Sequence, residues 1–341
     1  MTSSRQPGGR APSMSDVATL AGVSHQTVSR VIADHPNVRP RTRARVLAAI
    51  DELSYLPNTA ARALATGRSR TLGVVSMNST LFGPASTLYS IEEAAKQAGY
   101  FVTVASVRSF DRASLREATT RLLGQAVDGL VVIAPLVSAA DALRDLPKDI
   151  AIVSVEGDPG SGDAVVRVDQ VGGARLATEH LLAAGHRTVW HVAGPHDWFD
   201  AQGRIAGWQA ALQQRGAEVP PLLSGDWSAR SGYQAGQVLA RMPEVTAVFA
   251  GNDQMALGLL RALSERNRQV PADVSVVGFD DIPEAAFYTP PLTTVRQDFD
   301  EVGRRSLHMV IDQITSGAGG AGHVLVDTEL VVRQSTGPPP R

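Results

Sequence analysis

Four polar side chains near residue 25 are spaced so that they share one stripe of a short helix. They are His25, Gln26, Ser29 and Arg30. Positions i, i+1, i+4 and i+5 lie on one side of an α-helix. A glutamine amide can pair with adenine and an arginine fork with guanine, so this stripe could hydrogen bond to base edges in DNA. The alternative is an ordinary helical hairpin with a solvated polar face.

A second group of polar residues follows apolar strand candidates far downstream. Asn252 comes after Ala247–Ala250, and Asp280 comes after Val274–Gly278. Open α/β sheets bind ligands outside the carboxyl ends of their strands. These positions therefore predict a ligand site, although Asn252 and Asp281 could each instead cap the helix that follows.

Two further residues have side chains suited to a sugar. Arg204 begins the run that ends at Trp208, and a guanidinium fork can hold two adjacent hydroxyl groups. Trp227 offers an aromatic face for the apolar side of a pyranose. Each also has a structural alternative, a surface ion for Arg204 and core packing for Trp227.

Enzyme and metal chemistry are not favoured. The chain has no cysteine, which excludes a thiolate metal site and a cysteine nucleophile. It has no nucleophile-elbow, phosphate-loop or metalloprotease motif. His186, His191 and His196 are evenly spaced, but they straddle a strand and its flanking loops, so we expect structural roles. We predict no enzyme, no metal and no cofactor.

The charge distribution separates a basic head from an acidic body. The chain has 341 residues, enough for about two or three domains, and a net charge of −2. Residues 1–70 contain ten arginines and four acidic residues, a net +6, which leaves −8 for the remainder. Such asymmetry is typical of a small nucleic-acid-binding module joined to a larger body.

No segment suggests a membrane or an export signal. No apolar run approaches the roughly 20 residues that a bilayer span requires. The first twelve residues are rich in Ser, Gly, Pro and Arg and have no apolar core. We therefore expect a cytoplasmic protein with no membrane partner.

Three short helices are predicted to position the polar stripe. Ser15 can cap a helix over Asp16–Ala21, and Ser24 a second over about His25–Ala33. A third helix is expected over Arg41–Leu53. The first two helices are predicted to pack through Ala18, Leu20, Val23, Val28 and Val31. The third is predicted to have one apolar face, Val46, Leu47, Ile50 and Leu53.

From Thr71 onward, apolar strands alternate with amphipathic helices. The strand candidates are Leu72–Ser76, Phe101–Ala105, Gly129–Ala134, Ile150–Val155, Val165–Val168, Val189–Ala193, Ala247–Ala250 and Val274–Gly278. Helical patterns between them include Ser90–Ala98, Val171–Ala184, Gly203–Arg215 and Met255–Arg266. Continuous apolar strands between helices predict parallel sheets covered on both faces. So many strands favour two lobes with a cleft over one sheet.

The head resembles the LacI/GalR family of bacterial repressors. The matching motifs are Ala21-Gly-Val-Ser-x-Gln-Thr-Val-Ser-Arg-Val31, Pro40-x-Thr-Arg43 and Tyr55-x-Pro-Asn58. The resemblance continues along the chain to about Thr336 and is far more specific than a lone helix-turn-helix. It implies an α/β fold, with a two-lobed periplasmic-binding-protein-like body of parallel sheets, preceded by an all-α helix-turn-helix DNA-binding domain.

The resemblance also implies a division of the chain into segments. These are a disordered segment 1–12, the head 13–57, a hinge helix and linker 58–70, a two-lobed sensing and dimerisation body 71–336, and a tail 337–341. The N-lobe would comprise about 71–167 and 297–326, and the C-lobe about 168–296 and 327–336.

Residues for DNA contact follow from the family pattern. They are Thr19, Ser24, His25, Gln26, Thr27, Ser29, Arg30, Asn37, Asn58, Ala61 and Leu64. Leu64 would be an apolar wedge inserted into the minor groove, with packing on the protein as the alternative. His25 stands where a related family pattern has tyrosine, so the operator preference is not carried over.

Residues for the ligand are implied in the same way. They are Phe82, Pro84, Glu156, Asp200, Arg204, Trp227, Asn252, Asp280 and Gln297. Three departures change the pattern: Glu156 replaces an aspartate, Ile133 an asparagine and Asp200 a serine near Trp198. The resemblance implies a sugar site, with a galactoside as the first expectation.

The implied function is a homodimeric repressor on a pseudo-palindromic operator, with a small-molecule sugar effector. The proline run Pro338–Pro340 stands where a tetramer-forming heptad helix would lie, which favours a dimer. Two alternatives remain. One is a cytoplasmic solute-binding protein of the same body fold, disfavoured by the +6 head. The other is a regulator that responds to a non-sugar effector.

Overall fold

The structure is a computed structural model, and it describes residues 12–32, 35–55, 67–77, 80–158, 164–317 and 322–340. The chain divides into two compact units, which we call the head (Met1–Arg70) and the body (Thr71–Arg341). The predicted fold class is confirmed, because a helical head precedes a body built on two separate sheets. None of the described helices combines the length and the apolarity that a membrane span needs.

The described residues of the head form three helices: α1 (Met14–Ala21), α2 (His25–Ile32) and α3 (Pro40–Glu52). They enclose one small core, which consists of Val17, Ala18, Ala21, Val28, Val31, Val46, Ala49 and Tyr55. The turn between α1 and α2 is made by Gly22, whose φ of 61° is the left-handed conformation that glycine adopts without strain.

Two details of the predicted head are wrong. The cap of α1 is Ser13 and not Ser15: the Ser13 backbone N–H and hydroxyl both donate to an Asp16 carboxylate oxygen, at 2.7 and 2.6 Å. Leu20 and Leu47, predicted to be in the core, are 46% and 52% exposed. Neighbouring apolar residues, which include Val46, already fill that small core, so these two leucines face outward.

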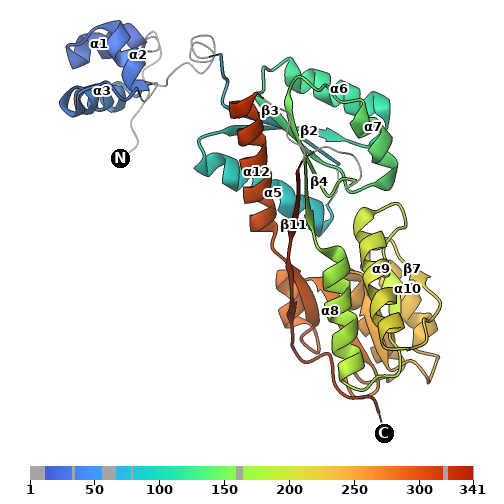
Figure 1. The fold of residues 1–341 in the computed structure, drawn as a ribbon. Helices are drawn as coiled ribbons and strands as arrows, with labels where there is room; N and C mark the ends of the chain where they lie inside the picture. The colour runs from blue at the N-terminus through green and yellow to red at the C-terminus, as the bar shows by residue number, and fades with distance from the viewer. Residues whose placement is uncertain are drawn as a thin grey trace. The chain divides into compact units, whose positions relative to one another are not determined.

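The first lobe of the body is a parallel sheet of strand order β11-β5-β4-β3-β1-β2. Its strands are β1 (Thr71–Met77), β2 (Phe101–Val107), β3 (Gly129–Ile133), β4 (Ala151–Val155), β5 (Ala164–Val168) and β11 (Gly322–Val326). Its helices are α5 (Phe82–Gln97), α6 (Arg112–Leu123), η1 (Val137–Ala139), α7 (Ala140–Arg144) and α12 (Phe299–Ser316). Helices α5 and α12 cover one face and α6 and α7 the other, each over its own apolar cluster (Figure 1).

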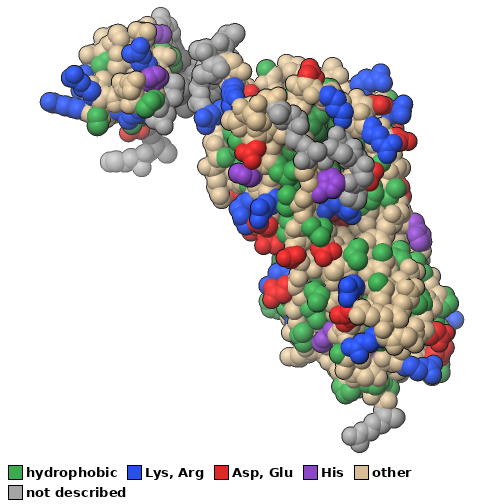
Figure 2. All heavy atoms as spheres, viewed as in Figure 1, with side chains coloured by type: hydrophobic (Ala, Val, Ile, Leu, Met, Phe, Trp, Pro, Cys, Tyr) green, Lys and Arg blue, Asp and Glu red, His purple; other side chains and the backbone are tan. Residues whose placement is uncertain are grey.

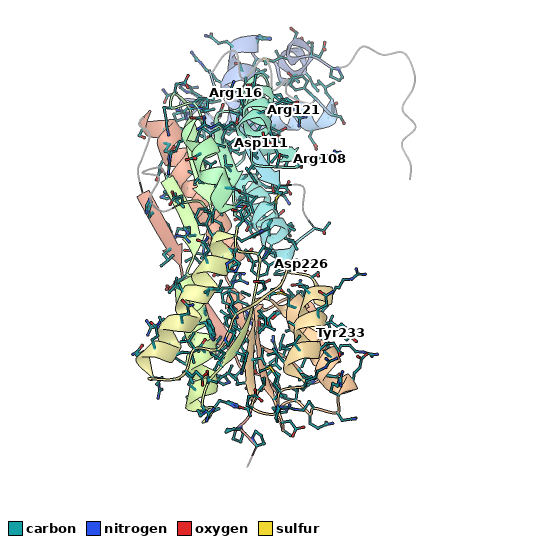
Figure 3. All side chains as sticks on the ribbon, turned by 90° about the vertical axis from the view of Figure 1, so that its right-hand side faces the viewer. Arg108, Asp111, Arg116, Arg121, Asp226 and Tyr233 are labelled. Carbon is teal, nitrogen blue, oxygen red and sulfur yellow. The ribbon has the colours of Figure 1, made fainter. Side chains whose placement is uncertain are left out.

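The second lobe has strand order β12-β10-β9-β8-β6-β7. Its strands are β6 (Trp190–Ala193), β7 (Leu223–Ser224), β8 (Ala247–Ala250), β9 (Ser275–Asp280), β10 (Thr293–Gln297) and β12 (Thr328–Val331). Its helices are α8 (Gln170–Ala183), α9 (Phe199–Gln214), α10 (Ala229–Leu239), α11 (Asp253–Glu265) and η2 (Pro283–Phe287). Helix α8 packs beside α9 and α10 beside α11, on opposite faces (Figure 3). Unlike the predicted parallel strands, β12 runs antiparallel to β10.

The chain passes between the lobes three times: from β5 to α8, from β10 to α12, and from β11 to β12. Both sheets therefore contain strands from distant parts of the sequence. Two predicted helix starts are corrected. Helix α5 begins at Phe82 and not Ser90, and α9 begins at Phe199 and not Gly203. The earlier start of α9 places Asp200 one helical turn before Arg204, on the same face.

Candidate ligand pocket and nucleic-acid interface

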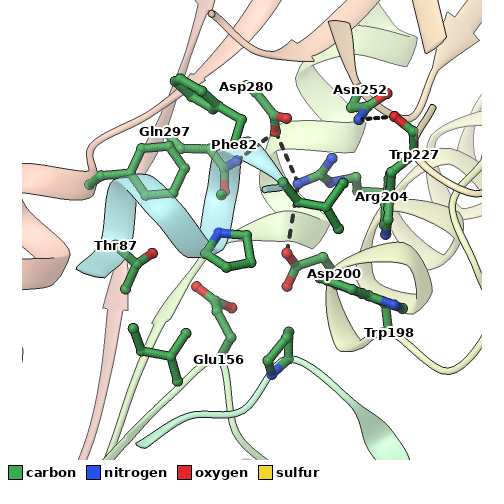
Figure 4. Close-up of a pocket in the computed structure, with 16 residues that line it drawn as sticks. Phe82, Thr87, Glu156, Trp198, Asp200, Arg204, Trp227, Asn252, Asp280 and Gln297 are labelled. Atoms are coloured by element: carbon green, nitrogen blue, oxygen red, sulfur yellow. Dashed lines mark hydrogen bonds and ion pairs between the residues drawn. The ribbon is translucent and has the colours of Figure 1, made fainter. Parts of the chain in front are cut away.

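One cavity of the body lies at the carboxyl ends of strands from both sheets (Figure 4). It contains about 530 Å³ of space, counted with the open solvent at its mouth. The nine residues predicted to bind a ligand all line it: Phe82, Pro84, Glu156, Asp200, Arg204, Trp227, Asn252, Asp280 and Gln297. Ile133 and Trp198 line it as well. Their contact with a ligand stays a prediction.

Arg204 lies at the centre of the polar wall, only 3% exposed. Its guanidinium donates to the Gln170 side chain at 2.9 Å, to the Gly251 carbonyl, and to Asp280 at 3.4 Å. The guanidinium also lies over the Phe279 ring, with Cζ 3.8 Å from the ring centre. It is a buried ion with several partners, and not the surface ion of the alternative.

A series of side-chain hydrogen bonds extends from Arg204 to the segments that connect the two lobes, where Gln170 and Gln297 lie. Gln297 donates to Asp280 at 2.7 Å and accepts from Gln170 at 2.9 Å. Sequence reasoning missed Gln170, which does not line the cavity but links Arg204 to Gln297. It follows the strand β5, so the strand-end rule that identified Asn252 and Asp280 would have identified it too.

Asn252 and Trp227 form one side of the pocket together. The Asn252 side chain accepts from the Met255 backbone N–H at 2.8 Å, so it does cap α11. Its amide donates to the Trp227 carbonyl at 3.0 Å. The Trp227 indole packs edge-on against Trp198, with ring centres 5.8 Å apart. Gly194 lies directly beneath this indole, where a Cβ atom would overlap the ring.

Asp281 and Asp253 lie outside the pocket. Asp281 accepts from Arg333 at 2.6 Å and from Arg296 at 2.7 Å, so it is an ion-pair partner and not the helix cap of the alternative. Asp253 is fully buried and accepts from the Thr294 hydroxyl at 2.6 Å. Burial raises the pKa of Asp253 well above its usual range.

Three carboxyl groups line the cavity, those of Glu156 and Asp280, which are buried, and that of Asp200, which is half-buried. Burial raises the pKa of Glu156 well above its usual range, and the nearby Asp200 raises it further. Burial also raises the pKa of Asp200, against the opposing effect of Arg204. The pKa of Asp280 rises to about 6 for the same reason, although Arg204 opposes the rise. When several carboxyl groups share a site of low dielectric constant, ionisation of one raises the pKa of the others.

The backbone of the pocket is strained at three lining residues. Glu156, Trp227 and Asp280 have φ values of 57°, 69° and 107°, in the left-handed region. Each such residue costs on the order of 1–3 kcal/mol unless it is glycine, and such residues cluster at ligand sites. Their positions agree with a binding role for this cavity.

Replacing Asp280 with asparagine tests its raised pKa. The folded pKa of about 6 exceeds the ordinary 3.8. Wild-type stability therefore falls as the pH rises from 3.8 through 6, because ionisation is harder in the folded state. Asp280→Asn removes this titration, so its stability relative to wild type should improve by about 2 kcal/mol from pH 4.5 to pH 7.5. Urea unfolding at both pH values measures the difference.

The hydrogen bonds lost from Arg204 and Gln297 affect this comparison equally at both pH values. The exposed Asp149→Asn variant is the control and should show no such change. An Asp280→Asn difference that is the same at both pH values would show that Asp280 ionises normally.

The three evenly spaced histidines do not converge. His191 is fully buried, stacks on Phe249 at 4.5 Å, and has a pKa lowered to about 4 by burial. His186 bonds with the Thr246 hydroxyl at 2.9 Å, and His196 lies 3.5 Å from the Ser224 hydroxyl. Among the described residues, no three metal-ligating side chains gather in one place.

The head presents the predicted polar stripe on α2. His25, Gln26 and Arg30 are exposed, Ser29 is half-buried, and the opposite face of α2 packs into the core. Ser24 begins the helix by accepting from the Thr27 N–H at 3.2 Å. Figure 2 shows further arginine side chains on the surface of the head. Thr19 and Asn37 are also exposed, whereas Asn58, Ala61 and Leu64 lie outside the described residues.

Arg30→Ala should weaken binding to a specific operator about 5- to 150-fold, since a bidentate base contact is worth about 1–3 kcal/mol. The operator duplex would first be selected by the wild-type protein from a random pool, and affinity measured by fluorescence anisotropy. Arg121→Ala, on the exposed surface of α6 in the body, is the matched control (Figure 3). An equal loss on random DNA would assign Arg30 to phosphate contact instead.

A helix-turn-helix head joined to a two-lobed body with a polar pocket defines a ligand-responsive DNA-binding regulator. Residues 13–58 match the model of bacterial regulatory proteins of the lacI family, and residues 178–336 match the periplasmic binding protein-like domain. The chain belongs to the lacI family.

Two curated relatives are similar over nearly the whole chain. The lactose operon repressor of Escherichia coli (strain K12) is 37% identical over 327 residues, 94% of this chain and 89% of that protein. The HTH-type transcriptional regulator CelR of Thermobifida fusca is 36% identical over 339 residues, 96% of this chain and 98% of that protein.

Solved structures of a lac repressor and of CelR are also similar to this chain. The lac repressor dimer bound to operator and the anti-inducer ONPF has a TM-score of 0.82 at 35% identity, covering 96% of this chain and all of that chain. The transcriptional regulator CelR in complex with cellobiose has a TM-score of 0.71 at 34% identity, covering 95% and 99%.

Proposed function

We propose that this protein is a homodimeric transcriptional repressor whose operator affinity is controlled by a small sugar in the body pocket. The main supporting observation is that the same chain contains two features. One is an exposed polar stripe on α2, including Gln26 and Arg30, and the other is a buried polar pocket around Arg204. We assign no catalytic role to the protein. A repressor works in the cytoplasm, where its operator lies.

The head binds DNA as one half of a symmetric pair. Each α2 enters the major groove of one half-site, and the two-fold symmetry of the dimer matches a pseudo-palindromic operator. The arginines that give residues 1–70 a charge of +6 contact phosphates and make the affinity salt-dependent. The lac repressor relative was solved as a dimer on its operator. Within the head, we assign residues 13–57 to the DNA-binding domain and 58–70 to the hinge helix and linker.

A sugar suits the pocket because the pocket combines aromatic walls with hydrogen-bonding groups. Trp198 and Trp227 provide apolar faces, and Arg204, Asp280 and Gln297 provide donors and acceptors. One relative is named for the lactose operon, and another was solved with cellobiose. A galactoside is our first candidate, and a glucoside such as cellobiose is the second.

Sugar binding and operator binding are coupled through the body. A ligand held by both lobes changes the equilibrium between lobe arrangements, and with it the ability of two heads to bind one operator. Couplings of this kind are about 1–3 kcal/mol, or about 5- to 150-fold in affinity, and act in both directions.

The direct test is an operator titration of the full-length protein with and without lactose, galactose, cellobiose and glucose. At least one sugar should weaken operator binding about 5- to 150-fold. Tighter binding with a sugar would make that sugar a co-repressor. No change with any sugar would contradict the effector assignment, although operator binding itself would stand.

A further inference from the structure

Two carboxyl groups meet in the pocket from opposite lobes. Glu156 follows β4 of the first lobe, and Asp200 lies in the first turn of α9 in the second lobe. Both line the cavity, and Figure 4 shows their carboxyl groups at the same end of it. They lie close enough for the Asp200 carboxyl to raise the pKa of Glu156.

Each of these side chains has a buried oxygen with no partner. Glu156 accepts from the Val168 backbone N–H at 2.9 Å through Oε1, while its Oε2 is unpaired. Asp200 Oδ1 is also unpaired, and its Oδ2 lies 4.0 Å from the Arg204 guanidinium. Glu156 is only 8% exposed. Buried polar atoms are nearly always hydrogen bonded in native proteins, so unpaired ones that line a cavity indicate a missing ligand donor.

The charge of the cavity wall is biased toward acid. Three carboxyl groups line it, those of Glu156, Asp200 and Asp280, and Arg204 is the only cation among its described lining residues. The Arg204 fork already bonds to Gln170, Gly251 and Asp280. An anionic ligand placed here would meet carboxyl groups of its own sign without an uncommitted cation to offset them.

We propose that Glu156 and Asp200 together determine which sugars this pocket accepts, by receiving hydrogen bonds from the hydroxyl groups of a neutral sugar and excluding sugars that carry a carboxylate or a phosphate. This inference rests on the proposed sugar-effector function and specifies its ligand class. A neutral hydroxyl group can donate to an ionised carboxylate and accept from a protonated one, so a sugar can bind without changing the charge of the two carboxyl groups.

The pH response follows from the groups around the pair. Glu156 faces Asp200 and Arg204 from α9 and Arg167 from β5, and Asp200 also faces Asp280 from β9. Binding of a hydroxyl group does not require the charge of Glu156 and Asp200 to change, whereas an anion binds more tightly when one more of these carboxylates is protonated. Any residual binding of a sugar acid should therefore strengthen as the pH falls, and binding of the neutral sugar should change less.

The test is calorimetric titration of the full-length protein with matched sugars. Glucose would be compared with glucuronate and glucose 6-phosphate, galactose with galacturonate, and cellobiose and lactose would be included. For the sugar that binds, we expect the affinity of the neutral form to be at least about 100-fold higher than that of its acid or phosphate. In Asp200→Asn and Glu156→Gln, this ratio should shrink at least about 10-fold. The exposed Asp149→Asn should leave it unchanged.

The outcomes separate the two proposals. Binding of an anionic sugar as tightly as its neutral parent would overturn the selection while preserving the sugar-effector function. An unchanged ratio in both Asp200→Asn and Glu156→Gln would also overturn the assigned roles. Failure of every sugar to bind would overturn the effector function and the selection together. Asp200→Ser, with a smaller neutral side chain, is a second variant in case Asp200→Asn does not fold. The ratio of neutral to anionic sugar affinity in the wild-type protein tests the selection without any variant.

Discussion

Arg204→Met should lose its response to sugar and should unfold about 3–5 kcal/mol more easily than wild type. The methionine keeps much of the side-chain length but leaves Asp280 buried without its cation and removes the donors to Gln170 and the Gly251 carbonyl. Removing one partner of a buried ion pair typically costs that much, because the remaining charge is uncompensated. Urea unfolding measures the stability, and operator titration with sugar measures the response.

Two further variants separate the causes. In Arg204→Met with Asp280→Asn, the unpaired charge is gone, so stability should partly recover while the sugar response stays lost. In Arg204→Lys the charge remains, but an ammonium cannot match the planar fork that bonds to three acceptors, so the response should be weak. Arg215→Met, at the exposed end of the same helix, is the control. A normal sugar response in Arg204→Met would remove Arg204 from the binding site.

Residues whose role depends on local pattern could be predicted from the sequence. The stripe on α2 follows from helical spacing alone, since Val28 and Val31 occupy the opposite face and are buried. Asn252 and Asp280 were found because each follows an apolar strand, and a ligand site at strand ends is a property of the architecture. The family resemblance singled out Glu156, although this residue also directly follows an apolar strand, Ala151–Val155.

Features that depend on pairing between distant segments could not be predicted. Strand β10 contains Thr293 and Thr294, which read as surface residues but are fully buried. The Thr294 hydroxyl donates to Asp253 on α11, and the Thr293 hydroxyl accepts from the Arg333 backbone N–H at 2.9 Å. These partners lie 41 and 40 residues away in the chain, so no window of sequence contains both members.

Gln170 lies between these two cases, because its place after β5 could have been predicted but its partners could not. Its importance comes from bridging Arg204 and Gln297, which are separated from it by 34 and 127 residues. Leu20 is the opposite case, because its helical position suggests burial while the small head core has no room for it. In a small helical unit, neighbouring helices cover only a narrow stripe of each helix. Apolar residues at the edge of that stripe therefore stay exposed.

A chain that lacks residues 1–66 should bind sugar as the full-length protein does but should lose specific operator binding by at least about 10³-fold. The apolar clusters of both lobes lie within residues 71–341, so the body needs no side chain of the head to complete its core. The exposed residues of α2, by contrast, are absent from the shortened chain. Sugar titration and operator anisotropy on the same preparation measure both properties.

The full-length variant with Gln26→Ala and Arg30→Ala is the comparison for this truncation. It keeps most arginines of the head, so it should retain salt-dependent binding to random DNA while losing preference for the operator. The shortened chain should lose both kinds of binding, since it lacks the whole basic segment. Operator preference in the shortened chain would place the base-reading surface in the body and overturn the assignment of α2. Loss of sugar binding on truncation would instead mean that the pocket depends on the head.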